Sequence, residues 1–264
     1  MKLSEIAQAL EEIAPLRYAE SWDNVGLIVG DPGAEIAKVL VTVDYTALVA
    51  EEAARLGANL VVAYHPPLFA AVKRVPHDAV WADAVRRGIA LYSPHTALDV
   101  AREGTNDCLA SACGVSDAAR RPLRPFVAKG ARVEPEGVGL GRIGAVAPIL
   151  RRGLVTALKS KLGLGYVLVS GPVDTEAKTV AVAAGAGGEL LEEAIRAGAD
   201  VFVTGEVRHH DALSAAKRGV TVIATLHSNS ERAAIRAYRD RIEKRLPSLS
   251  VTFSDVDRDP FQIV

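Results

Sequence analysis

The sequence has little cysteine, few aromatic residues, no marked excess of charge and no long apolar run. Its 264 residues include 2 cysteines, and aromatic residues make up 5%. Two cysteines are too few for a disulfide-stabilised scaffold. Cys108 and Cys113 fall in one expected helix on different faces, so we expect both to be reduced thiols.

The charge balance and the short apolar stretches exclude two further classes of protein. A formal net charge of −1 does not suit a protein that binds nucleic acid by neutralising many phosphates, so no DNA or RNA partner is expected. Apolar stretches such as 39–43 and 60–63 are far shorter than the ~20 residues that span a bilayer. The first residues lack the apolar run of a signal peptide. We therefore expect no membrane partner and a cytoplasmic location.

The chain resembles itself in two places, which predicts an internal duplication. Residues 51–62 align without a gap with 192–203, and 87–95 resemble 218–227 with one extra residue. Each copy has the pattern strand, helix, strand, helix, strand, with glycine ending the helices. This pattern favours parallel strands covered by helices. The predicted fold is α/β (α+β) with two similar domains, 1–125 and 126–264, the C-terminal segment packing back on the first.

The composition changes between the two copies. Within the glycine-rich run 137–144, residues 139–144 fit G-x-G-x-x-G, but no apolar strand precedes them and no helix opens on the third glycine of the motif. We interpret it as a connection and not as a dinucleotide site. A helix is expected over 148–161, a strand over 166–170 and a long amphipathic helix over 230–246.

Coordinating side chains follow four of the expected strands, and five of the six histidines lie in these segments: 64–67, 93–99, 205–211 and 226–231. In an open parallel sheet, ligands bind beyond the carboxyl ends of the strands. His95 and Asp99 are four positions apart, as are His227 and Glu231, so a helical turn would place each pair on one face.

Imidazole and carboxylate groups together suit Zn²⁺, Fe²⁺ or Mn²⁺ better than Mg²⁺ or Ca²⁺. Because no thiolate takes part, an open site that carries water is favoured over a structural zinc site. The alternative is local capping, with Ser230 as the cap of the last helix and Glu231 in its first turn. The recurrence of such segments in both copies favours metal binding.

Five motifs resemble those of the NIF3-like family, whose bacterial members are often labelled GTP cyclohydrolase 1 type 2 homologues. The motifs occur in order along nearly the whole chain: Trp22-Asp23-Asn24-Val25-Gly26-Leu27, Tyr64-His65-Pro66-Pro67-Leu68-Phe69, Ser93-Pro94-His95-Thr96-Ala97-Leu98-Asp99, Gly205-Glu206-Val207-Arg208-His209-His210-Asp211 and His227-Ser228-Asn229-Ser230-Glu231-Arg232.

The resemblance implies two similar, interlocked domains, a dinuclear metal centre in the cleft between them and a ring-shaped homohexamer. It implies the metal ligands His65, Asp99, His227 and Glu231, with Glu231 as the bridge. His95 matches a family histidine that ligates or orients.

One residue departs from the pattern of many bacterial members. Tyr64 stands where they have a second histidine, and the Tyr64-His65-Pro66-Pro67 version is similar to the branch typified by eukaryotic NIF3-like proteins. A phenol with a pKa near ~10 is a poorer ligand than imidazole unless the metal ionises it. We therefore expect one or two divalent ions, the second site being weaker or relying on His95 or water.

Two functions follow from these residues. The first is a metal-dependent hydrolase that acts on a nucleotide or another phosphorylated small molecule, with GTP ring opening implied by the family label. In it, Glu206, His209 or His210 would move the proton. The second is a non-catalytic protein that binds or delivers metal, or serves as a scaffold or regulator.

Overall fold

The structure is a computed structural model that describes residues 1–127 and 134–264. Its contacts group the chain into two compact units. Unit 1 consists of Met1–Ala101 and Ile235–Arg258, and unit 2 of Arg102–Ala234 and Asp259–Val264. Both contain a sheet covered by helices, which confirms the predicted mixed α/β architecture. The predicted division at 125/126 concerns the repeated sequence and stays a prediction.

Among the described residues, unit 1 holds a five-stranded sheet in the order β1-β4-β3-β2-β12. Its strands are β1 (Gly26–Val29), β2 (Lys38–Thr42), β3 (Leu60–Ala63), β4 (Ala90–Ser93) and β12 (Ser250–Phe253). Strands β2, β3 and β4 are parallel, as the repeated pattern predicts. The C-terminal strand β12 is also parallel to β2, and β1 is antiparallel to β4. The carboxyl ends of β2, β3 and β4 therefore lie at one edge.

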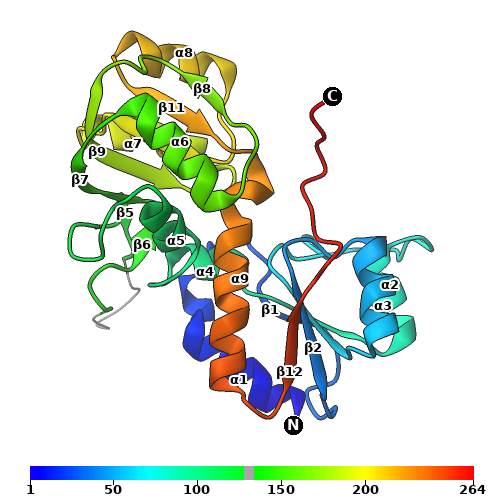
Figure 1. Cartoon of the computed structure of the whole chain (residues 1–264). Helices are drawn as coiled ribbons and strands as arrows, with labels where there is room; N and C mark the ends of the chain where they lie inside the picture. Colours follow the sequence, from blue (N-terminus) through cyan, green and yellow to red (C-terminus); the bar gives the residue numbers. More distant parts are fainter. Residues whose placement is uncertain (128–133) are drawn as a thin grey trace. The chain divides into compact units, whose positions relative to one another are not determined.

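The helices of unit 1 cover both faces of this sheet because successive strand residues point to opposite sides. Val39 and Val41 enter one apolar core with α1 and the residues of α9 from Ile235 onward, whereas Leu40 enters another with α2 and α3. Figure 1 shows α2 and α3 together on one side of β2. The helices are α1 (Leu3–Ile13), the 3₁₀ turn η1 (Leu16–Tyr18), α2 (Ala47–Leu56), α3 (Val80–Arg87), α4 (His95–Val100) and α9 (His227–Arg245), which begins in unit 2.

Local sequence explains where α2 begins and where α2 and α3 end. The hydroxyl of Thr46 accepts a hydrogen bond from the backbone N–H of Val49 at the start of α2. Gly57 and Gly88 then end α2 and α3 in the left-handed conformation, with φ of 65° and 67°. These are the glycine stops that the sequence predicts.

In the described residues, unit 2 holds a second five-stranded sheet, in the order β7-β9-β10-β11-β8. Strands β9, β10 and β11 are parallel, and β7 and β8 are antiparallel edge strands. Helices α5 and α6 share a core with one face, and α7 and α8 with the other. The elements are α5 (Thr105–Ala112), β5 (Arg124–Pro125), β6 (Gly139–Leu140), β7 (Arg142–Leu150), α6 (Arg151–Leu162), β8 (Leu168–Ser170), β9 (Glu176–Ala183), η2 (Gly187–Leu190), α7 (Leu191–Arg196), β10 (Val201–Thr204), α8 (His209–Lys217) and β11 (Thr221–Ala224).

The interpretation of 137–144 as a connection is wrong. This run contains β6 and the start of β7, which pairs with β9 along the edge of the sheet. Position 144 of β7 requires glycine, because a side chain there would overlap Val115 and the carbonyl of Ala119. The predicted helix over 148–161 begins later, at Arg151, because β7 continues to Leu150.

Two absences predicted from composition can be compared with the structure. Cys108 and Cys113 form no disulfide in the described part of the chain, as predicted, and Cys113 is buried. Within residues 1–127 and 134–264, no helix combines the length and apolar composition needed to cross a membrane.

Candidate metal centre

The candidate histidine of unit 1 is His65, which lies just beyond the end of β3. The neighbouring parallel strand β2 ends shortly before Asp44, so the two side chains meet at the carboxyl edge of the sheet. The Nδ1 atom of His65 lies 2.8 Å from Oδ1 of Asp44. An ionised carboxylate can only accept, so Nδ1–H donates and the ring presents Nε2 as its ligand atom.

Tyr64 and Asp99 form a second contact in unit 1. Tyr64 is buried, and its hydroxyl donates a hydrogen bond of 2.6 Å to Oδ1 of Asp99 on α4. The residue that replaces the second histidine therefore contacts a predicted ligand. Its phenol fixes the Asp99 carboxylate, which is the role of an outer-shell residue at a metal site.

His95 begins α4 with a positive φ of 26°. This conformation is energetically unfavourable for any residue other than glycine. The Nδ1 atom of His95 lies 2.8 Å from Oδ1 of Asp23, whose side chain is completely buried and also accepts hydrogen bonds from the backbone N–H and hydroxyl of Thr96. Burial alone would raise the pKa of Asp23, but the hydrogen bonds from His95 and Thr96 outweigh it and lower that pKa. Asp23 thus stays ionised and holds the imidazole.

These contacts bring the unit 1 candidates together. The ring centroids of His65 and His95 are 5.5 Å apart, and Tyr64 lies 4.9 Å from His65 and 5.5 Å from His95. Tyr64 in turn binds Asp99. All four predicted residues of unit 1 thus gather at the ends of β3 and β4.

In unit 2, His227 and Glu231 lie on one face of α9, as their spacing predicts. The Nε2 atom of His227 is 3.3 Å from Oε1 of Glu231, whose side chain is 2% exposed. Leu226, just before the helix, has a φ of 70°, which costs roughly 1–2 kcal/mol for a residue other than glycine. The chain thus turns sharply between β11 and α9, and α9 opens on His227.

Glu206 is the second carboxylate beside His227. It follows β10 and places Oε1 3.1 Å from Nδ1 of His227. Nδ1 of His227 is therefore engaged by one carboxylate, while Nε2 faces another. The two carboxylates hold the orientation of the imidazole.

Gly185 and Ser230 complete the surroundings of this pair. Gly185 has a φ of +62°, and a Cβ there would lie 2.5 Å from Oε1 of Glu231 and 3.3 Å from Nε2 of His227. The Ser230 hydroxyl accepts from the N–H of Gly185 and donates to the carbonyl of His227. Ser230 lies inside α9, so its alternative assignment as the helix cap is wrong.

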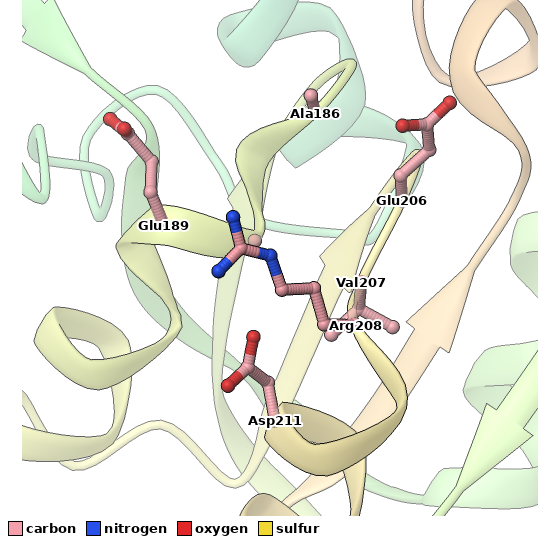
Figure 2. Close-up of a pocket in the computed structure, with 7 residues that line it drawn as sticks. Ala186, Glu189, Glu206, Val207, Arg208 and Asp211 are labelled. Atoms are coloured by element: carbon pink, nitrogen blue, oxygen red, sulfur yellow. The ribbon is translucent and has the colours of Figure 1, made fainter.

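The two other proton-transfer candidates, His209 and His210, begin α8. Both are exposed, and their ring centroids lie 5.3 Å apart in an edge-on arrangement. The structure thus pairs Glu206, and not these histidines, with His227. A cavity of about 450 Å³ lies beside Glu206 and is lined by Ala186, Gly188, Glu189, Val207, Arg208 and Asp211. Figure 2 shows the guanidinium of Arg208 directed between Glu189 and Asp211.

Sequence reasoning missed three parts of this arrangement. Asp44 follows β2, so the strand-end rule that selected His65 also identifies it. Asp23 lies within the first of the five family motifs, but local spacing does not indicate its contact with His95. Gly185 gives no signal of its own, because its importance comes from the side chains of Glu231 and His227.

Replacing Tyr64 with phenylalanine is expected to weaken divalent metal binding about tenfold, because outer-shell hydrogen bonds hold ligating carboxylates in place. Isothermal titration with Zn²⁺ and Mn²⁺ measures the change. Tyr92→Phe is a matched control, since the described residues offer the buried Tyr92 hydroxyl no hydrogen-bond partner. Equal metal affinity in Tyr64→Phe and Tyr92→Phe would show that the Tyr64 hydroxyl does not support the site.

Known proteins are similar to this chain in sequence and in fold. A family model described as Duf34/NIF3 (NGG1p interacting factor 3) matches residues 1–260. NIF3-like protein 1 of Drosophila melanogaster is 35% identical over 277 residues, covering 100% of this chain and 89% of the relative. A Clostridium perfringens protein named GTP cyclohydrolase 1 type 2 homolog is 29% identical, with 100% of both chains covered. The crystal structure of a Staphylococcus aureus hypothetical protein matches with a TM-score of 0.90 and 27% identity, covering 100% of this chain and 99% of its own.

Proposed function

Because the chain belongs to the Duf34/NIF3 family, we propose that it binds one or two divalent metal ions and hydrolyses a nucleotide or another phosphorylated small molecule. The observation that carries the metal proposal is a repeated pairing. His65, His95 and His227 each engage Nδ1 with a carboxylate, from Asp44, Asp23 and Glu206. Metal-ligating histidines characteristically bond their second nitrogen in this way.

The proposed ligands are His65 and Asp99 of unit 1 and His227 and Glu231 of unit 2, with His95 as an additional candidate. Within unit 2, Nε2 of His227 and Oε1 of Glu231 lie 3.3 Å apart, so both can reach one ion. Nitrogen and carboxylate oxygen ligands without thiolate favour Zn²⁺, Fe²⁺ or Mn²⁺. The missing side chain at Gly185 fits this proposal, because any Cβ would enter the space beside Nε2 of His227 and Oε1 of Glu231.

A bound divalent ion would supply acidity, since coordination lowers the pKa of water toward neutrality. The chain itself would supply orientation and proton transfer. Glu206 is the foremost candidate proton acceptor because its half-exposed carboxylate reaches His227. His209 and His210 are the other candidates, since they directly follow Arg208 of the adjacent cavity.

The substrate class is supported by the cavity beside Glu206 and by the name of one relative. Arg208 offers a guanidinium, whose planar fork of N–H donors suits a phosphate, beside the carboxylates of Glu189, Glu206 and Asp211. The relative from Clostridium perfringens is named as a GTP cyclohydrolase 1 type 2 homolog, so a guanine nucleotide is the first substrate to test. We also propose, from the family resemblance, that copies of the chain assemble into a homohexamer.

The test combines metal analysis with hydrolysis assays on wild type and His227→Ala. Wild type is expected to retain one or two divalent ions per chain, and His227→Ala to retain under about one tenth of that, because a ligand is lost. His77→Ala, at an exposed histidine outside the proposed ligand set, serves as the control and is expected to match wild type. GTP, GMP and other nucleotides form the substrate panel.

A wild-type protein without stoichiometric metal would contradict the metal proposal. Stoichiometric metal without turnover above the His227→Ala background would contradict the hydrolase proposal and leave a metal-binding or metal-delivery protein.

A further inference from the structure

Two large aromatic side chains of unit 1 stand exposed beside the candidate histidines. Trp22 is 57% exposed and Phe69 is 51% exposed, and their ring centroids lie 5.7 Å apart. Aromatic residues are scarce in this chain, and the tyrosines of the two unit 1 cores are buried. Paired, solvent-exposed aromatic rings are typical of binding surfaces and have no role in a core.

The loops that carry these rings are held in place by specific contacts. The side-chain amide of Asn24 donates a hydrogen bond of 2.6 Å to the carbonyl of Leu68, which ties the loop before β1 to the loop after β3. Asp23, directly after Trp22, is buried and bonded to His95 and Thr96. Trp22 and Phe69 are thus fixed against each other while their rings face solvent, so little conformational entropy is lost when a ligand binds.

The same rings adjoin the candidate metal ligands of unit 1. The ring centroid of His95 lies 6.2 Å from Trp22 and 6.3 Å from Phe69, in edge-on arrangements, and 5.5 Å from His65. A ligand whose reacting atoms lie at His65 would therefore bring its neighbouring ring system to Trp22 and Phe69.

We propose that Trp22 and Phe69 form an aromatic platform that binds the planar base of a nucleotide. This inference rests on the proposed function and names the part of the substrate that unit 1 recognises. The planes of the two rings are inclined by 41°, so one planar base can stack on only one of them. Trp22, the larger ring, stacks on the base, and Phe69 contacts its edge. Stacking of this kind accepts any base, because every base has a π face.

The experiment compares GMP and AMP with ribose 5-phosphate, which carries a phosphate but no base. The chain has two tryptophans, so a Trp81→Phe background leaves Trp22 as the sole tryptophan reporter. GMP and AMP are expected to quench its fluorescence saturably, and ribose 5-phosphate is not. By calorimetry, Trp22→Ala is expected to raise the Kd of GMP about tenfold or more. Phe69→Ala should raise it less, and Trp22→Tyr should keep most of the affinity.

Two controls accompany the experiment, and three outcomes would decide against one of the proposals. Phe261→Ala removes another exposed aromatic ring and should leave GMP binding unchanged, and metal content should be unchanged in Trp22→Ala. An unchanged Kd of GMP in metal-loaded Trp22→Ala would overturn the platform and leave the proposed function intact. A sedimentation change in Trp22→Ala at unchanged GMP affinity would overturn it in favour of a contact between copies. Wild type without metal, but with GMP binding that depends on Trp22, would contradict the proposed function and support the platform.

Discussion

A Gly185→Ala variant is expected to bind Zn²⁺ or Mn²⁺ about 100-fold more weakly than wild type. The added Cβ would lie 2.5 Å from Oε1 of Glu231 and 3.3 Å from Nε2 of His227. A separation of 2.5 Å is far inside van der Waals contact, and the Glu231 side chain is 2% exposed, so it has little room to move away. The methyl group would therefore displace one proposed ligand and crowd another. Calorimetric titration, with a competing chelator for tight binding, measures the affinity.

Gly163→Ala separates this steric effect from backbone strain. Gly163 also has a positive φ, +67° against +62° at Gly185, but a Cβ there would meet nothing within 4 Å. Both variants carry the cost of a left-handed alanine, roughly 1–2 kcal/mol, and only Gly185→Ala fills the space between His227 and Glu231. Gly163→Ala should therefore lose stability and keep its metal affinity. Equal metal affinities in the two variants would contradict the assignment of His227 and Glu231 as ligands.

An Asp107→Ala variant is expected to lower the free energy of unfolding by about 3–5 kcal/mol. Arg142 has a side chain that is 1% exposed, and its Nε donates to Oδ1 of Asp107 at 2.5 Å. Its Nη1 donates to the carbonyls of Gly139 and Gly141. Asp107 also accepts from the backbone N–H of Glu103. Removing the carboxylate leaves a buried guanidinium without its counter-charge, which costs far more than a surface ion pair is worth.

Asp117→Ala provides the matched control for Asp107→Ala. Asp117 pairs with Arg120 but is 89% exposed, so its removal should cost at most about 1 kcal/mol. Urea unfolding followed by circular dichroism measures both variants. A loss below about 1 kcal/mol in Asp107→Ala would show that the Arg142–Asp107 pair does not stabilise unit 2.

Local sequence was sufficient to predict much of the parallel core. Alternation of β-branched runs with glycine-ended helical segments predicts β2-α2-β3-α3-β4 and β9-α7-β10-α8-β11, and the strand pairings agree. The run 137–144 was misinterpreted because glycine usually marks turns. In β7, Gly144 is instead required because Val115 and Ala119, which are distant from it in sequence, approach its backbone too closely for a side chain.

For the candidate site, too, some features follow from local sequence and others from tertiary structure. The sequence by itself determined which side chains follow the parallel strands, and the four-residue spacing of His227 and Glu231 determined that they share a helix face, because helical geometry repeats locally. Only the tertiary structure decided which carboxylate holds each imidazole: Asp44 for His65, Asp23 for His95 and Glu206 for His227. It alone decided that Gly185 leaves space beside His227. These contacts join residues about 20 to 70 positions apart, so chain folding and not local propensity brings them together.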